Sequence, residues 1–385
     1  MKEVRKIRQQ FQVNFSFDLI FTSNLFDIDN SILVDVLSQN QIGRTKALMV
    51  IDQGVVESHP SLKDAIKSYF DYNSSQVELC GNILVVPGGE QAKNNEDYIR
   101  YVLDGVNEFG VDRHSYIVVI GGGAVIDAVG YAAAIAHRGV RLVRIPTTVL
   151  SQNDSGVGVK NGINFFGKKN FIGSFATPYA IINDDTFLTT LDDRNWRSGV
   201  SEAVKVALIK DLDFFEWIEI NAKALSERDM ESMNELIYKC ADMHMEHIRT
   251  SGDAFEMGSS RPLDFGHWAA HKLEQISNYE ILHGEAVAVG VALDSTYSYL
   301  KGYINESELK RILDCILQLG FVISYDQMND KVIAGLEEFR EHLGGKLTIM
   351  LLESLGKGFE VHEMDEISVM QSMEYLSLYT QKIVS

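Results

Sequence analysis

The chain has 385 residues, 45% of them hydrophobic, and a formal net charge of −19. This length predicts two domains with sizeable cores, and the acidic balance argues against a protein that binds nucleic acid. No apolar run is long enough to span a membrane, and no apolar signal segment follows the charged N-terminus. The three cysteines follow no disulfide or metal motif. We therefore expect a protein of the reducing cytoplasm that has no membrane partner.

The first half of the chain alternates short apolar runs with helix-like segments, which predicts a parallel sheet with helices on its faces. Residues 11–17 alternate apolar and polar side chains with period 2, so we expect an antiparallel edge strand there. A helical pattern spans residues 95–109. Buried strands are expected over residues 47–52, 83–86, 116–120, 142–145 and 179–182.

A glycine-rich turn, Gly121–Gly123, follows the strand expected at 116–120 and leads into an apolar helical pattern. A glycine turn between a strand and a helix is a context in which the helix N-terminus binds phosphate. The spacing differs from GxGxxG, so a plain tight turn is an equally good interpretation. Two more loops, 87–93 and 146–148, follow neighbouring strands at the edge where open α/β sheets bind ligands.

The stretch from Ser151 to Gly173 is rich in glycine and lysine, and its pattern predicts loops. Lysines in such a loop are usually solvated. Here they lie close in sequence to the presumed phosphate turn of an otherwise acidic chain, which favours an anion-binding site. The polar residues of interest are Asp154, Lys160, Lys168, Lys169 and Asn170.

From about residue 190 onward, helical patterns dominate. Two strand-like runs, 347–352 and 359–362, predict a hairpin within this part. We therefore expect an α/β domain over residues 1–190 and a mainly helical domain over 191–385, with a ligand cleft between them. The helices are expected over residues 196–209, 230–249, 261–276, 285–301 and 306–319.

Three histidines and a glutamate in the second half form the strongest chemical pattern. His267 and His271 are one helical turn apart and share a helix face, and His283 begins the next helical pattern. Glu202 lies upstream, where it shares a helix face with Lys205; alone, that pair would be an ordinary surface ion pair. A catalytic zinc takes three protein ligands, here Glu202, His267 and His283, and leaves a position for water or substrate. His271 would then be a base or a substrate contact.

In this order, these segments resemble the 3-dehydroquinate synthase family, the sugar-phosphate cyclases. The resemblance covers nearly the whole chain. It implies a Rossmann-like NAD-binding domain followed by a helical metal-binding domain, usually in a homodimer. The motifs that carry it are PGGEQAKN, GGGAVID, HRGV, RIPTT, DSGVGVK, GKKNFIG, SEAVKVALI, LDFGHWAAHKLE and LHGEAVAVG.

The resemblance also implies roles for individual residues. It makes Glu202, His267 and His283 the ligands of a zinc ion, for which cobalt is an alternative. It assigns contacts with NAD to Asp52, Glu90, Lys93, Gly121, Gly122, Gly123, Asp127, Thr147 and Thr148. It assigns the substrate and catalytic pocket to Arg138, Asp154, Lys160, Lys169, Asn170, Lys205, Asp264 and His271.

The implied activity is a carbon–oxygen lyase reaction on a small sugar phosphate, either a heptulosonate or a heptulose phosphate. In this family NAD transiently oxidises a secondary alcohol, phosphate leaves, the hydride is returned and the chain closes into a carbocycle. This sequence has Asp264 where the family has asparagine, and a substrate-binding lysine of the family falls on His244, Glu246 or His247. These departures predict weaker binding of a carboxylated sugar and favour a heptulose phosphate, as in cyclases of the 2-epi-5-epi-valiolone synthase type. His271 argues against that specific assignment, because its loss is associated with those cyclases.

Two other classes of protein fit parts of the pattern. A metal-dependent polyol dehydrogenase related to glycerol dehydrogenase would share the fold and the NAD turn, but it would not need Lys205 or the lysines near residue 160. A scaffold or sensor that retains NAD and zinc is a non-enzymatic alternative.

Overall fold

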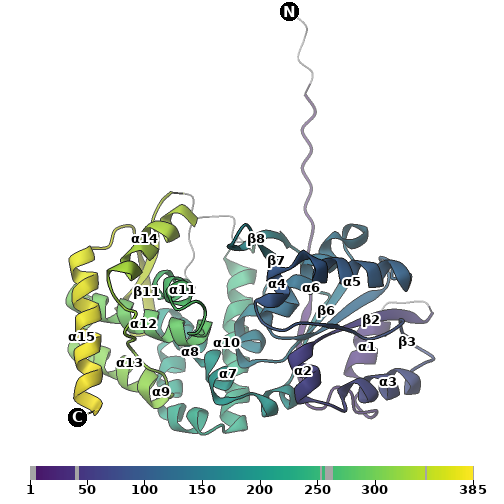
Figure 1. The fold of residues 1–385 in the computed structure, drawn as a ribbon, viewed down its shortest axis with the longest axis horizontal. Coiled ribbons are helices and arrows are strands. Elements are labelled where there is room, and N and C mark those ends of the chain that lie inside the picture. The colour runs from purple at the N-terminus through teal and green to yellow at the C-terminus, as the bar shows by residue number, and fades with distance from the viewer. Residues whose placement is uncertain (1–5, 40–42, 252–253, 256–262, 343–344, 385) are drawn as a thin grey trace, which may run out of the picture.

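The computed structural model describes residues 6–39, 43–251, 254–255, 263–342 and 345–384. Figure 1 shows an α/β half built on a sheet and a half made almost entirely of helices, side by side. This arrangement confirms the expected fold class. Among the described residues, no helix is long and apolar enough to cross a membrane.

The sheet of the α/β half contains seven strands among the described residues, in the order β1-β9-β6-β5-β2-β3, and β4 also pairs with β2. Every pairing within it is parallel. The strands are β1 (Asp18–Thr22), β2 (Thr45–Asp52), β3 (Val77–Leu79), β4 (Leu84–Val86), β5 (Tyr116–Gly121), β6 (Arg141–Pro146) and β9 (Ala180–Asp184).

Helices cover both faces of this sheet because its central strands are apolar on both sides. All six residues of β5 are buried, which is typical of a strand inside a parallel sheet. Alternate residues of β2 and β5 pack with α1 and α3 on one face and with α5 and α6 on the other. The helices of this half are α1 (Ile32–Ser38), α2 (Gln53–Ser58), α3 (Leu62–Tyr72), α4 (Gln91–Asn94), α5 (Glu96–Glu108) and α6 (Gly123–Ile135).

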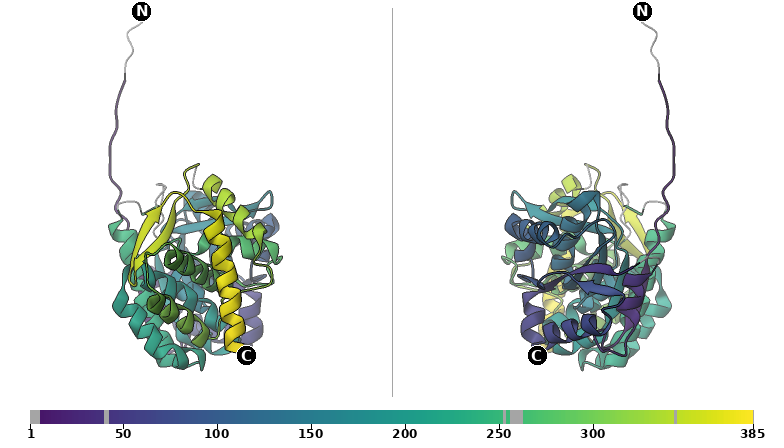
Figure 2. Two further views of the ribbon diagram at one scale, coloured as in Figure 1. Left: turned by 90° about the vertical axis from the view of Figure 1, so that its left-hand side faces the viewer. Right: turned by 90° about the vertical axis from the view of Figure 1, so that its right-hand side faces the viewer.

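The N-terminal segment differs from the prediction. Residues 11–17 form no strand, and the edge strand is β1, which runs parallel to β9 instead of antiparallel. Figure 2 shows the chain before β1 as an arm that projects from the body. Its alternating pattern is real, but most of its apolar side chains face water: Phe11 is 83% exposed, whereas Phe17 packs against the body.

The predicted loop between Ser151 and Gly173 is also wrong in part. A short helical turn (Ser151–Ser155) is followed by an antiparallel hairpin of β7 (Lys160–Phe165) and β8 (Lys168–Phe175). Glycines and lysines conceal the alternation of this hairpin in the sequence. Ile163 and Ile172 nevertheless pack it against α6.

The helical half is built around α12, of whose 18 residues 14 are buried, as expected for a helix that is apolar on all sides. Figure 2 shows α15 on the outer surface of this half. The elements are α7 (Asp193–Ser198), α8 (Val200–Lys210), α9 (Leu212–Ser226), α10 (Met230–Thr250), α11 (His267–Ile276), α12 (His283–Leu300), α13 (Glu306–Gln318), α14 (Asp330–His342), β10 (Ile349–Ser354), β11 (Lys357–Val361) and α15 (Glu366–Val384).

Two helix boundaries in this half differ from the prediction. The helix expected over 196–209 is divided into α7 and α8 at Gly199, where a Cβ atom would lie 2.4 Å from the backbone nitrogen of Leu150. The helix expected from Arg261 begins at His267, and Arg261 itself lies outside the described residues. The predicted hairpin near the C-terminus is confirmed as β10 and β11.

Candidate active site

Three helices of the helical half bring the predicted metal ligands together. Glu202 lies on α8, His267 is the first residue of α11 and His283 is the first residue of α12. The Oε1 atom of Glu202 lies 3.6 Å from Nε2 of His267 and 3.3 Å from Nε2 of His283. One ligand atom from each residue lies within 4.8 Å of the others. Two imidazoles and a carboxylate in this arrangement suit a zinc ion with one open position.

The burial of Glu202 supports a cation at this point. Its side chain is fully buried, where an uncompensated carboxylate charge is unfavourable. The ammonium group of Lys205 forms an ion pair with Oε2, which leaves Oε1 facing the two histidines. Burial would raise the pKa of Glu202, but Lys205 and the histidines outweigh it and hold this pKa well below its ordinary value. The carboxylate is therefore ionised and available to a metal.

Close packing of α11 against α12 fixes the position of His267. Gly266 precedes the helix with φ of 76°, a left-handed conformation that favours glycine. A Cβ atom on Gly290 of α12 would lie 2.0 Å from the carbonyl oxygen of Gly266, so the helices approach closely only with glycine there. The carboxylate of Asp294, also on α12, accepts from Gly266 N (3.0 Å) and from the Trp268 indole (2.9 Å).

The N-terminus of α12 holds His283 in a similar way. The Glu285 carboxylate accepts from the backbone nitrogen of Leu282 (2.9 Å) and binds Arg194 through two hydrogen bonds of 2.8 and 2.7 Å. This capping arrangement satisfies a free backbone donor at the helix start. Gly284 donates to Ser198 Oγ (3.2 Å), which joins α12 to α7.

His271 completes a group of three imidazoles. Its ring centroid lies 5.5 Å from that of His267 and 5.8 Å from that of His283. Its side chain is exposed, whereas His267 is buried. The position fits the prediction that His271 contacts substrate or transfers a proton beside the metal ligands.

Glu274 is a residue of this site that the sequence analysis missed. It is buried, its Oε2 atom lies 3.1 Å from Nδ1 of His283, and its Oε1 atom lies 3.0 Å from Nζ of Lys169. The signal was present, because Glu274 is seven residues after His267 and so lies on the same helix face. With His271 and His283, it forms a second group whose ligand atoms lie within 4.8 Å of one another.

Asp154 and Asp264 lie close enough to Lys205 to raise its pKa, and His244 pairs with Asp154. Asp154 Oδ1 lies 3.0 Å from Nδ1 of His244, so His244 is the one of the three aligned positions that faces this site. Glu246 pairs with Arg249 instead and is largely exposed. Oδ2 of Asp264 is buried without a hydrogen-bond partner among the described residues, and the Asp264 charge contributes to raising the pKa of Lys205.

The predicted cofactor residues gather where strands of the sheet end. Asp52 ends β2, Gly121 ends β5, and the backbone nitrogen of Thr147 donates to the carbonyl of Gly121 (3.1 Å). Gly122 precedes α6, and a Cβ atom there would lie 3.6 Å from the Thr148 methyl group. Burial raises the pKa of Asp52, although backbone hydrogen bonds from Gly54 and Gly122 oppose it. A helix N-terminus preceded by glycines provides backbone donors for a pyrophosphate.

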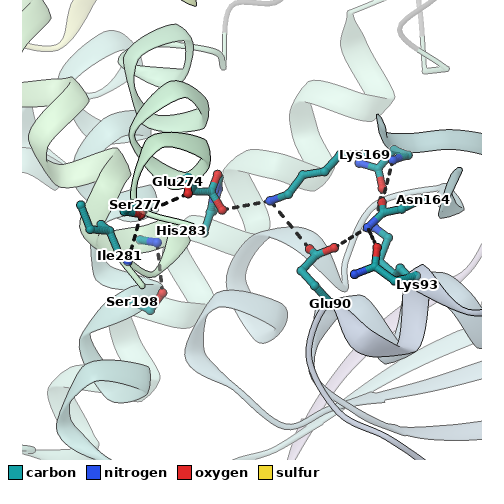
Figure 3. Close-up of polar contacts among 12 residues, drawn as sticks. Glu90, Lys93, Asn164, Lys169, Ser198, Glu274, Ser277, Ile281 and His283 are labelled. Carbon is teal, nitrogen blue, oxygen red and sulfur yellow. Dashed lines mark hydrogen bonds and ion pairs between the residues drawn. The ribbon is translucent and has the colours of Figure 1, made fainter. Parts of the chain in front are cut away.

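Polar contacts join residues that are predicted to bind NAD to the β7–β8 hairpin. Lys93 is buried, its ammonium group lies 2.7 Å from Oδ2 of Asp127, and it also donates to Oδ1 of Asn170. Figure 3 shows Glu90 between Asn164, which donates to it at 2.7 Å, and Lys169, which lies 3.8 Å away. Glu90, Lys93 and Asp127, which are predicted to contact NAD, therefore lie around one region with Asn170, which is predicted to line the substrate pocket.

Arg144 positions the segment that carries Lys160 and was not singled out in the sequence. It is fully buried, and it donates to the carbonyls of Gly156 (3.0 Å), Gly158 (2.6 Å) and Lys160 (3.1 Å). A charged residue inside the apolar run of β6 is the signal that could have identified it. Burial lowers the pKa of Arg144 to about 10, so it remains a cation at neutral pH.

Arg138 is the predicted pocket residue that the chain does not bring to this site. It lies in an exposed turn after the C-terminal end of α6, whereas the glycine turn lies at the other end of this helix. The contact predicted between Arg138 and the substrate therefore remains a prediction.

Comparison with known proteins agrees with this geometry. The family model described as 3-dehydroquinate synthase N-terminal matches residues 83–198, and the model described as 3-dehydroquinate synthase C-terminal matches residues 199–338. The 3-dehydroquinate synthase of Dictyoglomus thermophilum is 33% identical over 307 residues, which cover 79% of this chain and 86% of that protein.

Two relatives with another name cover more of the chain. The 2-epi-5-epi-valiolone synthase of an Actinomyces species is 28% identical over 365 residues, covering 92% of this chain and 93% of that protein. The structure of the 2-epi-5-epi-valiolone synthase from Streptomyces hygroscopicus subsp. jinggangensis, with NAD+ and Zn2+ bound, superposes with a TM-score of 0.87 at 29% identity. It covers 97% of this chain and 100% of that chain. Together with the two matching domain models, these similarities show that the chain belongs to the 3-dehydroquinate synthase family of sugar-phosphate cyclases.

Proposed function

We propose that this protein is an NAD- and zinc-dependent cyclase that eliminates phosphate from a heptulose phosphate lacking a carboxylate. The observation that carries the proposal is the buried Glu202 carboxylate, facing His267 and His283 beside His271 and Lys205. The reaction class is a carbon–oxygen lyase. Cobalt is an alternative metal for the same ligands.

The residues divide the chemistry between them. When bound, NAD would take up and return a hydride, and zinc would polarise the reacting oxygen. Lys205 offsets the charge of Glu202, and Lys160 and Lys169 would bind the anionic phosphate. His271 lies where it could move a proton between substrate and solvent. NAD would be held at the ends of the strands. The residues proposed to contact it are Asp52, Glu90, Lys93, Gly121, Gly122, Gly123, Asp127, Thr147 and Thr148.

Asp264 supports a substrate without a carboxylate. Its buried, unpartnered oxygen lies in the same charged environment as Lys205 and His267. A substrate carboxylate placed there would meet a like charge in a poorly solvated site, which is unfavourable. His244, which pairs with Asp154, is one of the three positions on which the family's lysine would fall. Both differences reduce the attraction for a second anionic group.

Phosphate release from two sugars tests the proposal. The zinc- and NAD-loaded protein would be supplied with sedoheptulose 7-phosphate or with 3-deoxy-arabino-heptulosonate 7-phosphate. We expect release with the first and little with the second. Release with the second only would identify a 3-dehydroquinate synthase and contradict the role of Asp264. NADH accumulation from a polyol, with no phosphate release, would identify a dehydrogenase instead.

We also propose a homodimer in the cytoplasm, and a division into domains at residue 190. The projecting N-terminal arm and the free edge of β1 support a second copy as the partner. Cys80, Cys240 and Cys315 are free and buried, which fits a reducing compartment. The end of β9 and the short helical segment Asp185–Thr190 support the domain boundary.

A further inference from the structure

We propose that Glu274 has two roles beside the proposed metal ligands. It orients His283, and it connects the turn of the β7–β8 hairpin to the metal centre. Metal binding and docking of this turn would then be linked. This inference rests on the metal ligands proposed above. Glu274 is a positioning residue here, because it acts through His283 and Lys169.

Orientation of His283 follows from the hydrogen bond at its far nitrogen. Glu274 Oε2 lies 3.1 Å from Nδ1, and the other nitrogen, Nε2, faces Glu202 Oε1 at 3.3 Å. A carboxylate can only accept, so it selects the form in which Nδ1 carries the proton. Nε2 then presents its lone pair to the metal. Metal-binding histidines are generally held by such a partner, whose loss weakens metal binding about 10- to 100-fold.

The other carboxylate oxygen crosses to the α/β half. Oε1 lies 3.0 Å from Nζ of Lys169, which belongs to β8, while Glu274 belongs to α11. Figure 3 shows Lys169 reaching from the hairpin toward Glu274, with Glu90 of the cofactor loop on its other side. The ring of Tyr279 also lies 5.0 Å from this ammonium group. Lys169 thus connects a residue predicted to bind NAD to the partner of a metal ligand.

Burial strengthens both contacts of Glu274. Its side chain is 6% exposed, whereas that of Lys169 is 34% exposed. Ser277 Oγ donates to the backbone carbonyl of Glu274 (3.1 Å) and accepts from Ile281 N (3.3 Å), so the turn between α11 and α12 is held as well. Each oxygen of the Glu274 carboxylate has its own partner. Loss of either partner would leave a buried charge without a compensating contact.

Glutamine at this position discriminates between the proposed role and simple packing. Glu274→Gln has nearly the same shape but only one acceptor oxygen. If that oxygen faces Lys169, the amide NH2 group faces His283 and favours the form with the proton on Nε2. If it faces His283, the NH2 group faces the Lys169 ammonium. The variant therefore loses one of the two contacts whichever way it turns.

The experiment measures zinc affinity and hydrogen exchange, both without turnover. Zinc affinity would be obtained by competition with a chromophoric chelator. Exchange would be followed in residues 166–170 with and without saturating zinc. We expect Glu274→Gln to lose the zinc-dependent protection of this turn, and to bind zinc about 10- to 100-fold more weakly if its amide group faces His283. Glu227→Gln, which removes the same charge at an exposed pair on the helical half, should match the wild type.

Lys169→Met keeps the inference testable if Glu274→Gln fails to fold, because Lys169 lies in an exposed strand end. It should remove the zinc-dependent protection of residues 166–170. Zinc-dependent protection that persists in either variant would overturn the linkage. A wild-type protein that binds no zinc would instead overturn the proposed metal site.

Discussion

The buried pair of Glu202 and Lys205 shows what the proposed metal site would require of single residues. Both side chains are at most 3% exposed, and they are three residues apart on α8. Burial alone would lower the pKa of Lys205, but the Glu202 carboxylate outweighs it and holds this pKa above its ordinary value. In the metal-free protein, Lys205 compensates the charge of the buried Glu202 carboxylate, and a bound metal would share that role. The contribution of Lys205 to stability should therefore depend on metal loading.

Replacing Lys205 by methionine should therefore destabilise the metal-free protein more than the zinc-loaded one. Breaking a buried ion pair by removing one partner costs about 3–5 kcal/mol, whereas bound zinc would offset the unpaired charge of the buried Glu202 carboxylate. Urea unfolding of Lys205→Met, with and without zinc, measures both values. Lys210→Met changes an exposed lysine on the same helix and should alter stability by less than about 0.5 kcal/mol. Equal losses with and without zinc would contradict this account.

At the scale of elements, the pairing of α11 with α12 determines where two of the three ligands lie. Gly290 allows the close approach, and Asp294 accepts hydrogen bonds from both residues that flank His267. Burial raises the pKa of Asp294 to about 7, and the two hydrogen bonds oppose that rise only in part. The contact between these helices thus contains a group that titrates near neutrality.

The stability of the protein should consequently depend on pH through Asp294. Because the folded-state pKa lies above the ordinary 3.8, this group contributes fully to stability below that value. The contribution is lost as pH rises to about 7. Asp294→Asn cannot titrate, so the difference in unfolding free energy between wild type and variant should shrink from pH 5.5 to pH 8. Parallel curves in urea unfolding at the two pH values would exclude this effect.

The same pair of helices shows how far the sequence predicts the site. The spacing of His267, His271 and His283 predicts that these side chains cluster, because helical periodicity acts locally, and the structure brings them together. Asp294 and Arg144 were missed because each is a single charge inside an apolar run, and its partners come from other elements. The β7–β8 hairpin was missed for a related reason: its packing against α6 overrides a local pattern rich in glycine and lysine.

At the scale of the whole molecule, the N-terminal arm has exposed apolar side chains that the contacts of a single chain do not explain. The arm that starts at residue 6 projects from the body (Figure 2), and its last residue, Phe17, packs against the body where β1 begins at the sheet edge. Exposed apolar side chains alternate along the arm: Ile7, Phe11, Val13 and Phe15. An extended segment with alternating exposed apolar side chains, beside the edge strand of a sheet, favours pairing with another chain, and a second copy is the partner expected in this family.

Removal of the arm should therefore weaken the dimer. We expect the full chain to have twice its 43.2 kDa mass in light scattering coupled to size-exclusion chromatography. A chain that begins at Asp18 should shift toward the monomer at low micromolar concentration while retaining zinc binding. A variant that remains fully dimeric would show that the interface lies elsewhere.

The buried side chain of Lys93 has a consequence for the residence time of bound NAD. Lys93 joins α4 to α6 through Asp127 and to the β7–β8 hairpin through Asn170. Because these contacts exist before NAD binds, the ligand would have to order little of the proposed binding site. Such a site favours a long residence time. A dehydrogenase must exchange its coenzyme after every reaction, and slow departure would limit its rate. A cyclase restores its NAD before the product leaves, so one coenzyme molecule could serve many successive turnovers.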